Sequence, residues 1–95
     1  MSGKLRIGVI GCGGIAQMMH LPTFAERPDL FEVTALADIS EEVLNAVGER
    51  YHVARRSRDF RDVAKDQNVD AVFVLSSGRH DAALAAAYAA GKHVF

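Results

Sequence analysis

The feature that most constrains this chain is an apolar segment, residues 5–10, that leads directly into the turn Gly11-Cys12-Gly13-Gly14-Ile15-Ala16. The segment predicts a short buried strand, and the residues that follow the turn predict a helix. A strand, a G-x-G-x-x-A turn and a helix, in this order, form the fingerprint of dinucleotide-binding folds. The pattern therefore predicts both a fold and a phosphate-binding loop.

The small residues of this turn each have a mechanical role. Gly11 permits the sharp turn at the end of the strand, Gly13 leaves room for a pyrophosphate to approach the backbone, and Ala16 allows close packing of the helix. The free N–H groups of the first helical turn would face the phosphates, where the helix dipole favours negative charge. We therefore predict cofactor contacts from Gly11, Gly13, Gly14, Ile15 and Ala16; the alternative is a plain turn into a helix.

Residues 31–37 predict a second strand, and Asp38 stands at its end. In dinucleotide-binding domains an acidic residue here accepts hydrogen bonds from the adenosine ribose. Its spacing from Gly11 is longer than usual, and the segment 22–29 accounts for the excess. The alternative is that Asp38 only caps the next helix, although Ser40 already offers a cap. Because a carboxylate would repel a 2′-phosphate, we predict NAD as the cofactor in preference to NADP.

The rest of the chain alternates between helix and strand patterns. We expect the first helix to break or end near Leu21-Pro22, because proline disfavours helical geometry in the residue before it, and Pro22 can itself open a further turn from Thr23 to Glu26. Further predictions are a helix capped by Ser40, a strand over 52–55, a short helix capped by Ser57 or Asp59, a strand over 70–75, a helix over 80–90 ended by Gly91, and a last strand from residue 92. This alternation predicts an α/β fold: a Rossmann-like doubly wound parallel sheet, strand order 3-2-1-4-5, in a single three-layer domain over residues 1–95.

Composition argues against several functional classes. A net charge of −1 without a basic stripe argues against nucleic-acid binding. No apolar run approaches the roughly 20 residues of a membrane span, and the N-terminus carries no secretory signal, so we expect no membrane contact and a cytoplasmic location. With a single cysteine and four histidines that lack ligand spacing, we expect no disulfide and no metal site.

Several polar residues have two interpretations. We interpret Cys12 as a small structural residue, because no base that would activate it is evident. His20 is expected to serve helix termination or packing. In the turn after the fourth strand, Ser76 and Ser77 either hydrogen-bond the cofactor or satisfy the turn, and we predict at least one contact. His80 either caps its helix or lines the cofactor site.

The basic run 55–58 is interpreted as solvated surface, because acidic residues follow it closely. The alternative is a phosphate-binding patch. Nothing in the sequence places Arg55, Arg56 or Arg58 at the adenine end of a cofactor.

Five segments together carry a family resemblance: residues 6–16, His20-Leu21-Pro22 and Ala35-Leu36-Ala37-Asp38 in the first half, then Val69-Asp70-Ala71-Val72 and Ala90-Gly91-Lys92-His93-Val94, with His80 between these last two. In this combination the chain resembles the Gfo/Idh/MocA oxidoreductases along essentially its whole length. The resemblance implies an NAD- or NADP-binding Rossmann domain. In the family a C-terminal α/β domain follows, which carries substrate contacts and mediates oligomerisation.

Two departures from the family pattern affect the expected activity. Family members usually continue into a Glu-Lys-Pro motif whose lysine takes part in catalysis, and this chain ends at Phe95, before that motif. The family loop Thr-Pro-Asn is here Ser76-Ser77-Gly78-Arg79, which puts its contacts in doubt. We therefore expect the cofactor-binding part of an oxidoreductase that moves hydride between a nicotinamide and a sugar, polyol or related hydroxyl compound. Alone it would bind cofactor without turning over substrate, and none of its residues is predicted to be catalytic.

The sequence admits three alternative interpretations. A non-catalytic dinucleotide-binding module would share the glycines and Asp38. A methyltransferase-like fold usually has an acidic residue before the glycine turn, where this chain has Ile10. The chain could also lack a ligand; its last strand would then expose Val94 and Phe95 at an open edge, which favours a homo-oligomer.

Overall fold

The parallel sheet predicted from the sequence is present in the structure, a computed structural model that describes residues 4–14, 16–75 and 81–95. Its strands are β1 (Leu5–Ile10), β2 (Phe31–Ala37), β3 (Arg55–Ser57), β4 (Ala71–Val74) and β5 (His93–Val94). They form one sheet in the order β3-β2-β1-β4-β5, and every neighbouring pair is parallel. The α/β class and the strand order 3-2-1-4-5 are therefore confirmed.

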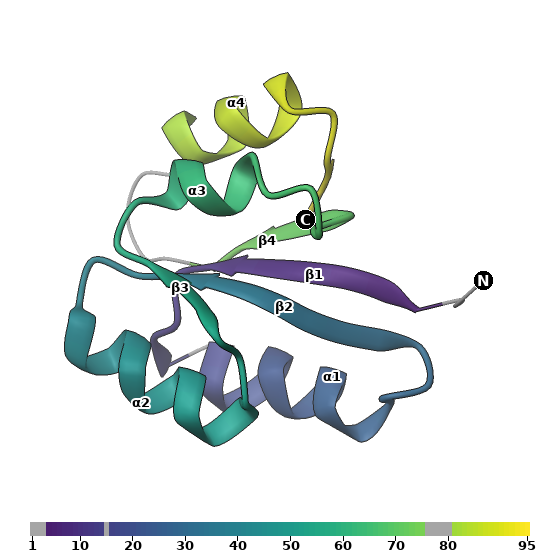
Figure 1. Ribbon diagram of the computed structural model, residues 1–95, viewed down its shortest axis with the longest axis vertical. Helices are drawn as coiled ribbons and strands as arrows, with labels where there is room; N and C mark the ends of the chain where they lie inside the picture. The colour runs from purple at the N-terminus through teal and green to yellow at the C-terminus, as the bar shows by residue number, and fades with distance from the viewer. Residues whose placement is uncertain (1–3, 15, 76–80) are drawn as a thin grey trace.

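Helices cover both faces of the sheet, which gives three layers (Figure 1). One face carries η1 (Ala16–His20), α1 (Leu21–Glu26) and α2 (Glu41–Tyr51), and the other carries α3 (Phe60–Ala64) and α4 (Asp81–Ala89). Side chains of the central strand β1 alternate between two cores, since successive residues of a strand point to opposite faces. Ile7 and Val9 are buried under α1 and α2, whereas Ile10 joins the core under α3 and α4.

The predicted helix ends follow local capping chemistry. The Ser40 side chain accepts a hydrogen bond from the backbone N–H of Val43 at the start of α2, and Asp59, one of the two predicted candidates, caps α3. Gly91 has a positive φ of 75°, and the next N–H, of Lys92, donates to the carbonyl of Ala87. These bonds form the left-handed helix ending that favours glycine.

One predicted boundary is confirmed in part and one is wrong. The π-helical turn η1 ends at His20, and α1 begins at Leu21 with Pro22 in its first turn, as predicted; the backbone does not leave helical geometry at the junction, however, because His20 stays helical. Proline is tolerated in the first turn of α1 because no α-helical bond needs its missing N–H there. The third strand starts at Arg55 rather than at 52, because His52 ends α2 in the left-handed conformation, with φ of 58°.

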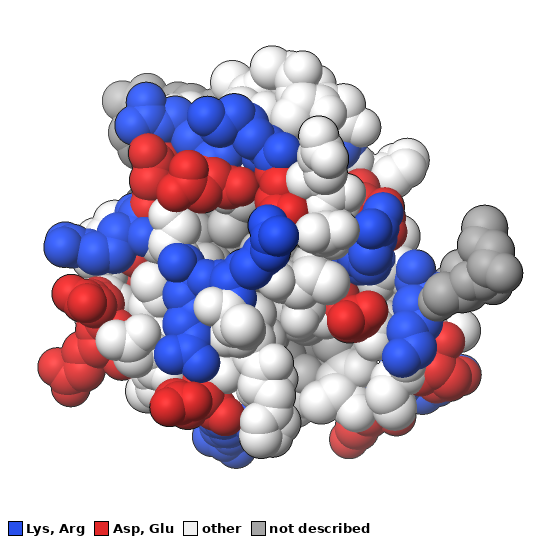
Figure 2. Space-filling view, in the orientation of Figure 1, with Lys and Arg blue, Asp and Glu red and all other residues white. Residues whose placement is uncertain are grey.

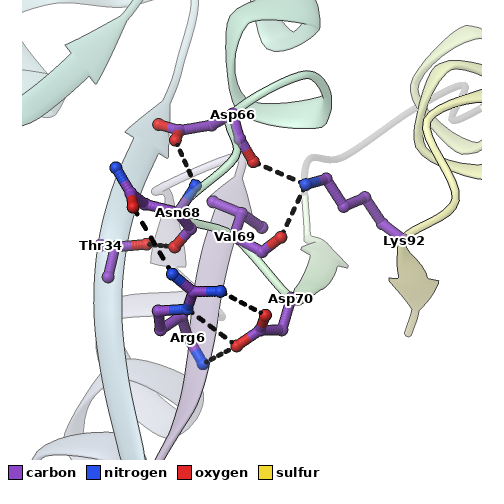
Figure 3. A network of polar contacts seen from close by, with 7 residues as sticks. All are labelled: Arg6, Thr34, Asp66, Asn68, Val69, Asp70 and Lys92. Carbon is purple, nitrogen blue, oxygen red and sulfur yellow. Dashed lines mark hydrogen bonds and ion pairs between the residues drawn. The ribbon is translucent and has the colours of Figure 1, made fainter.

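A polar network lies at the end of the sheet where β1 and β4 begin (Figure 3). The guanidinium of Arg6 donates to both oxygens of Asp70, at 3.1 and 2.9 Å, and the Arg6 backbone N–H donates to the same carboxylate. Lys92 Nζ donates to the carbonyls of Asp66 and Val69, at 2.6 and 2.7 Å. The network ties β1, β4 and the start of β5 together, opposite the edge that carries the glycine turn.

Candidate functional site

The glycine turn and the acidic residue meet at the carboxyl ends of β1 and β2. Gly11 leaves β1 with φ of 95°, a conformation that strains any residue with a side chain. Its N–H donates to the carbonyl of Ala37 at 2.8 Å, which holds the turn against the end of β2. In a parallel sheet with this strand order, the crevice beyond these ends is where ligands bind.

Asp38 joins the two loops directly. Its Oδ2 accepts a hydrogen bond from the Cys12 N–H at 2.7 Å, and its Oδ1 accepts one from the Ser40 N–H at 2.8 Å. Each oxygen keeps a further lone pair, so the carboxylate can still accept hydrogen bonds from a ligand. Since Ser40 itself caps α2, Asp38 is not the cap of that helix. Its contact with Cys12 is a role that the sequence reasoning missed.

Gly13 and Gly14 present bare backbone to open space. Both are exposed, and a Cβ atom added to either would meet no atom of the described residues within 4 Å. The carbonyl of Gly13 accepts the N–H of Gln17, and the Gln17 side chain donates to the carbonyl of Cys12 at 2.8 Å. Ala16 is fully buried at the start of η1. These contacts fix the buried side of the turn, and its other side is exposed, so a phosphate group can approach the backbone N–H groups.

A cleft of about 830 Å³ lies in front of this turn. Its volume falls within the usual range of ligand pockets, about 300–1,000 Å³. The residues that line it come from the ends of β1, β2 and β4 and the loops after β1 and β2, from α2, from the loop between β3 and α3, from the start of α3 and from α4: Ile10, Gly11, Gly13, Gly14, Ala37, Asp38, Ile39, Val43, Arg58, Phe60, Leu75, Ala82 and Ala83. Bare glycine backbone, a carboxylate and apolar walls match the phosphates, ribose and adenine of a dinucleotide.

The cleft contains residues that the sequence did not indicate. Ile39 is 84% exposed at its rim, and Val43, Arg58 and Phe60 also line it. The available signal was position alone: Ile39 follows β2, Arg58 follows β3, and Phe60 begins α3 at the same end of the sheet. A second cleft of about 560 Å³, between β3 and α3, lies away from the glycine turn and is walled by Arg55, Lys65 and Asp66 among others.

The basic run is for the most part paired. Arg55 forms an ion pair with Asp66 at 2.9 Å, and Arg56 donates to the carbonyl of Val53 at 2.7 Å. Figure 2 shows Lys and Arg beside Asp and Glu across this face of the molecule, rather than one basic patch. Within the described residues, Arg58 is the one member of the run that lines the cleft.

Cys12 and the described histidines have structural surroundings. Cys12 is fully buried, and burial, reinforced by the charge of Asp38, raises the pKa of its thiol to about 12. A thiol in these surroundings carries almost no thiolate at neutral pH, which agrees with the interpretation of Cys12 as a small structural residue. The ring of His20 packs 6.0 Å from that of Phe73, centroid to centroid. Among the described residues, no three His, Cys, Asp or Glu side chains form a group that could hold a metal ion.

Four predicted site residues lie outside the described residues: Ile15, Ser76, Ser77 and His80. The other five are described. Gly11, Gly13, Gly14 and Asp38 line the cleft, and Ala16 is buried behind the turn.

Comparison with known proteins agrees with this geometry. The model of a family described as "Oxidoreductase family, NAD-binding Rossmann fold" matches residues 5–95. The chain belongs to the Gfo/Idh/MocA oxidoreductase family. It corresponds to the NAD-binding Rossmann domain of this family, as the resemblance implied.

Three relatives illustrate the family. A myo-inositol 2-dehydrogenase of Thermotoga maritima is 36% identical over 92 residues, which are 96% of this chain and 27% of the relative. The scyllo-inositol dehydrogenase of Lactobacillus casei, solved with NAD(H) and scyllo-inositol, has a TM-score of 0.86 at 29% identity, covering 97% of this chain and 27% of its own. A mutant 3-ketoreductase of Actinomadura kijaniata, solved with NADP and TDP-benzene, has a TM-score of 0.85 at 35% identity, covering 96% and 29%.

The chain thus spans little more than a quarter of the length of these Gfo/Idh/MocA relatives. Across the described residues, no helix is long and apolar enough to cross a membrane.

Proposed function

We propose that this chain binds NAD in the cleft before the glycine turn and serves as the cofactor-binding part of an oxidoreductase. The observation that carries the proposal is the bond from Cys12 N–H to Asp38. It holds the ribose-binding candidate and the phosphate-binding candidate in one rigid unit. The substrate class that we propose for the whole protein is a sugar, polyol or related hydroxyl compound, in line with the inositol dehydrogenases among its relatives.

Each part of the cofactor has a candidate partner. The backbone at Gly13 and Gly14 would bind the pyrophosphate, because no atom of the described residues lies within 4 Å of a Cβ added to either glycine. The free lone pairs of Asp38 would accept the ribose hydroxyls. Ile39 and Phe60 would pack against adenine as apolar walls of the cleft. Ile15, Ser76, Ser77 and His80 remain predicted contacts.

The preference for NAD rests on charge. A carboxylate at position 38 attracts hydroxyl donors and repels a 2′-phosphate. The relatives differ in the cofactor they are solved with, NAD(H) in one and NADP in another, so the preference of this chain needs a direct test. A bound nicotinamide would supply hydride transfer. The described residues of this chain would bind and orient it, and we assign the catalytic proton transfer to none of them.

The test is calorimetric titration of the chain with NAD⁺. We expect Asp38→Ala to weaken binding about tenfold or more, the loss of one to two hydrogen bonds to a charged acceptor. Asp29→Ala removes the same charge from an exposed ion pair with Arg27, far from the cleft, and should leave affinity unchanged. Full NAD⁺ affinity in a folded Asp38→Ala variant would refute the assignment. The NAD⁺ affinity of Asp38→Asn, which keeps one acceptor oxygen, should lie between those of wild type and Asp38→Ala.

A further inference from the structure

Arg58 differs from the neighbouring arginines in what it contacts. Arg55 is paired with Asp66, and the guanidinium of Arg56 is held by Val53 and Glu49. Arg58 makes one hydrogen bond within the described part of the chain: its Nε donates to the carbonyl of Ile39 at 3.1 Å. Its two Nη groups have no partner among the described residues, although Arg58 lines the cleft.

That single bond determines where the charge lies. The carbonyl of Ile39 is one residue beyond Asp38, in the loop between β2 and α2. A guanidinium docked on this carbonyl through Nε directs its remaining donors away from the bond, since the group is planar and rigid. Asp38 accepts one hydrogen bond on each oxygen, from Cys12 and Ser40, and the ion pairs among the described residues do not include one between Asp38 and Arg58. The positive charge is therefore not consumed by the acidic residue beside it.

We propose that Arg58 recognises the 2′ position of the cofactor's adenosine ribose and gives a 2′-phosphate a favourable contact. This inference rests on the proposed function, because it takes the ribose to lie at Asp38. Two opposite charges then act on the same ribose position. Asp38 favours the hydroxyl of NAD, and Arg58, with donors suited to two phosphate oxygens, reduces the penalty for NADP. The chain should prefer NAD and still bind NADP measurably.

The experiment compares the dissociation constants of NAD⁺ and NADP⁺ for three proteins at low ionic strength. Arg58→Gln should weaken NADP⁺ binding about tenfold, the equivalent of one charge-assisted contact, and NAD⁺ binding less than about threefold. Arg27→Gln is the matched control, because it removes the same charge from the loop before β2, at the opposite edge of the sheet. It should change neither constant. Added salt should narrow the difference between wild type and Arg58→Gln for NADP⁺.

The outcomes separate this inference from the function on which it rests. If a folded wild-type chain binds neither dinucleotide, the proposed function itself fails. If it binds NAD⁺ and Arg58→Gln leaves the ratio of the two constants unchanged, only the role of Arg58 fails. Wild-type binding of NAD⁺ with no measurable NADP⁺ binding also overturns the role of Arg58.

Discussion

At the scale of the residue, the site depends on a few atoms that act on backbone rather than on side chains. The carboxylate of Asp38 accepts hydrogen bonds from Cys12 and Ser40, which belong to the loops after β1 and β2. An unpaired buried N–H costs about 1–3 kcal/mol, so the carboxylate stabilises the turn as well as offering lone pairs to a ligand. Substitutions of Asp38 will therefore affect both the stability of the loop and cofactor binding. A substitution of Gly13 should affect cofactor binding alone.

Gly13→Val should abolish dinucleotide binding without unfolding the chain. A Cβ at this position meets no atom of the described part of the chain within 4 Å, and the φ of Gly13 is not in the left-handed region, so we expect the fold to tolerate the side chain. The isopropyl group would fill the space that a phosphate needs. We expect NAD⁺ affinity to fall at least about tenfold, with thermal unfolding close to that of wild type. Unchanged affinity would show that the phosphates do not pass this backbone.

At the scale of the element, β1 and α3 approach so closely that the strand needs a glycine. A Cβ added to Gly8 would lie 2.5 Å from Cγ1 of Val63 in α3. Strand β1 is the centre of the sheet and ends in the glycine turn, so this contact also determines where the turn lies. Packing of α3 against β1 is therefore part of the support of the site.

Gly8→Ala should destabilise the chain by about 1–3 kcal/mol, as overpacking of a filled core does. Val63→Ala removes the obstructing methyl groups, so the cost of Gly8→Ala should be smaller in a Val63→Ala background. Urea unfolding of the two single variants and the double variant measures this coupling. Equal costs in both backgrounds would contradict the close approach of strand and helix.

Local chemistry decides which elements could be predicted from the sequence. Ser40 and Asp59 cap the starts of α2 and α3, and Gly91 ends α4, all through bonds to residues a few positions away, so the sequence contains the necessary information. The start of β3 could not be predicted in this way, because it depends on where the strand pairs with β2. Pro22 indicated the start of α1, but the sequence does not show that the residues before it form a π-helical turn, η1, that runs into α1 without leaving helical geometry.

At the scale of the whole molecule, the two ends of the parallel strands have different roles. The glycine turn and the cleft lie at the carboxyl ends, and the network of Arg6, Asp70 and Lys92 lies at the amino ends (Figure 3). Phe95, directly after the edge strand β5, is 64% exposed, although the centroid of its ring stacks 4.9 Å from that of Phe73. Self-association through this edge stays a prediction.

The network should make stability depend on acid pH. Hydrogen bonds from Arg6 lower the pKa of Asp70 from 3.8 to about 2. Because the pKa is lower in the folded chain, the contribution of Asp70 is complete above about pH 5 and is lost as the pH falls towards 2. Asp70→Asn should therefore unfold at lower urea concentration than wild type at pH 6, and the gap should narrow towards pH 2. A gap that is constant with pH would contradict the pairing.

The site itself was predictable only in part. Chain order indicates the glycine turn and Asp38, since each follows a strand and parallel strands end at one edge. Arg58 and Phe60 could not be assigned, because their place depends on how the loop after β3 folds back over the end of β2. The bond from Cys12 to Asp38 joins residues 26 positions apart, and no local pattern signals it.

The most direct test of the central claim is a two-dimensional ¹H–¹⁵N NMR titration of the isotope-labelled chain with NAD⁺. We expect the amide signals of Gly11, Gly13, Gly14 and Asp38 to shift with increasing cofactor. The signals of Asn68 and Asp70, at the opposite edge, should stay in place. Shifts confined to the cleft between β3 and α3, or none in a folded chain, would contradict the claim that the glycine turn and Asp38 hold the dinucleotide.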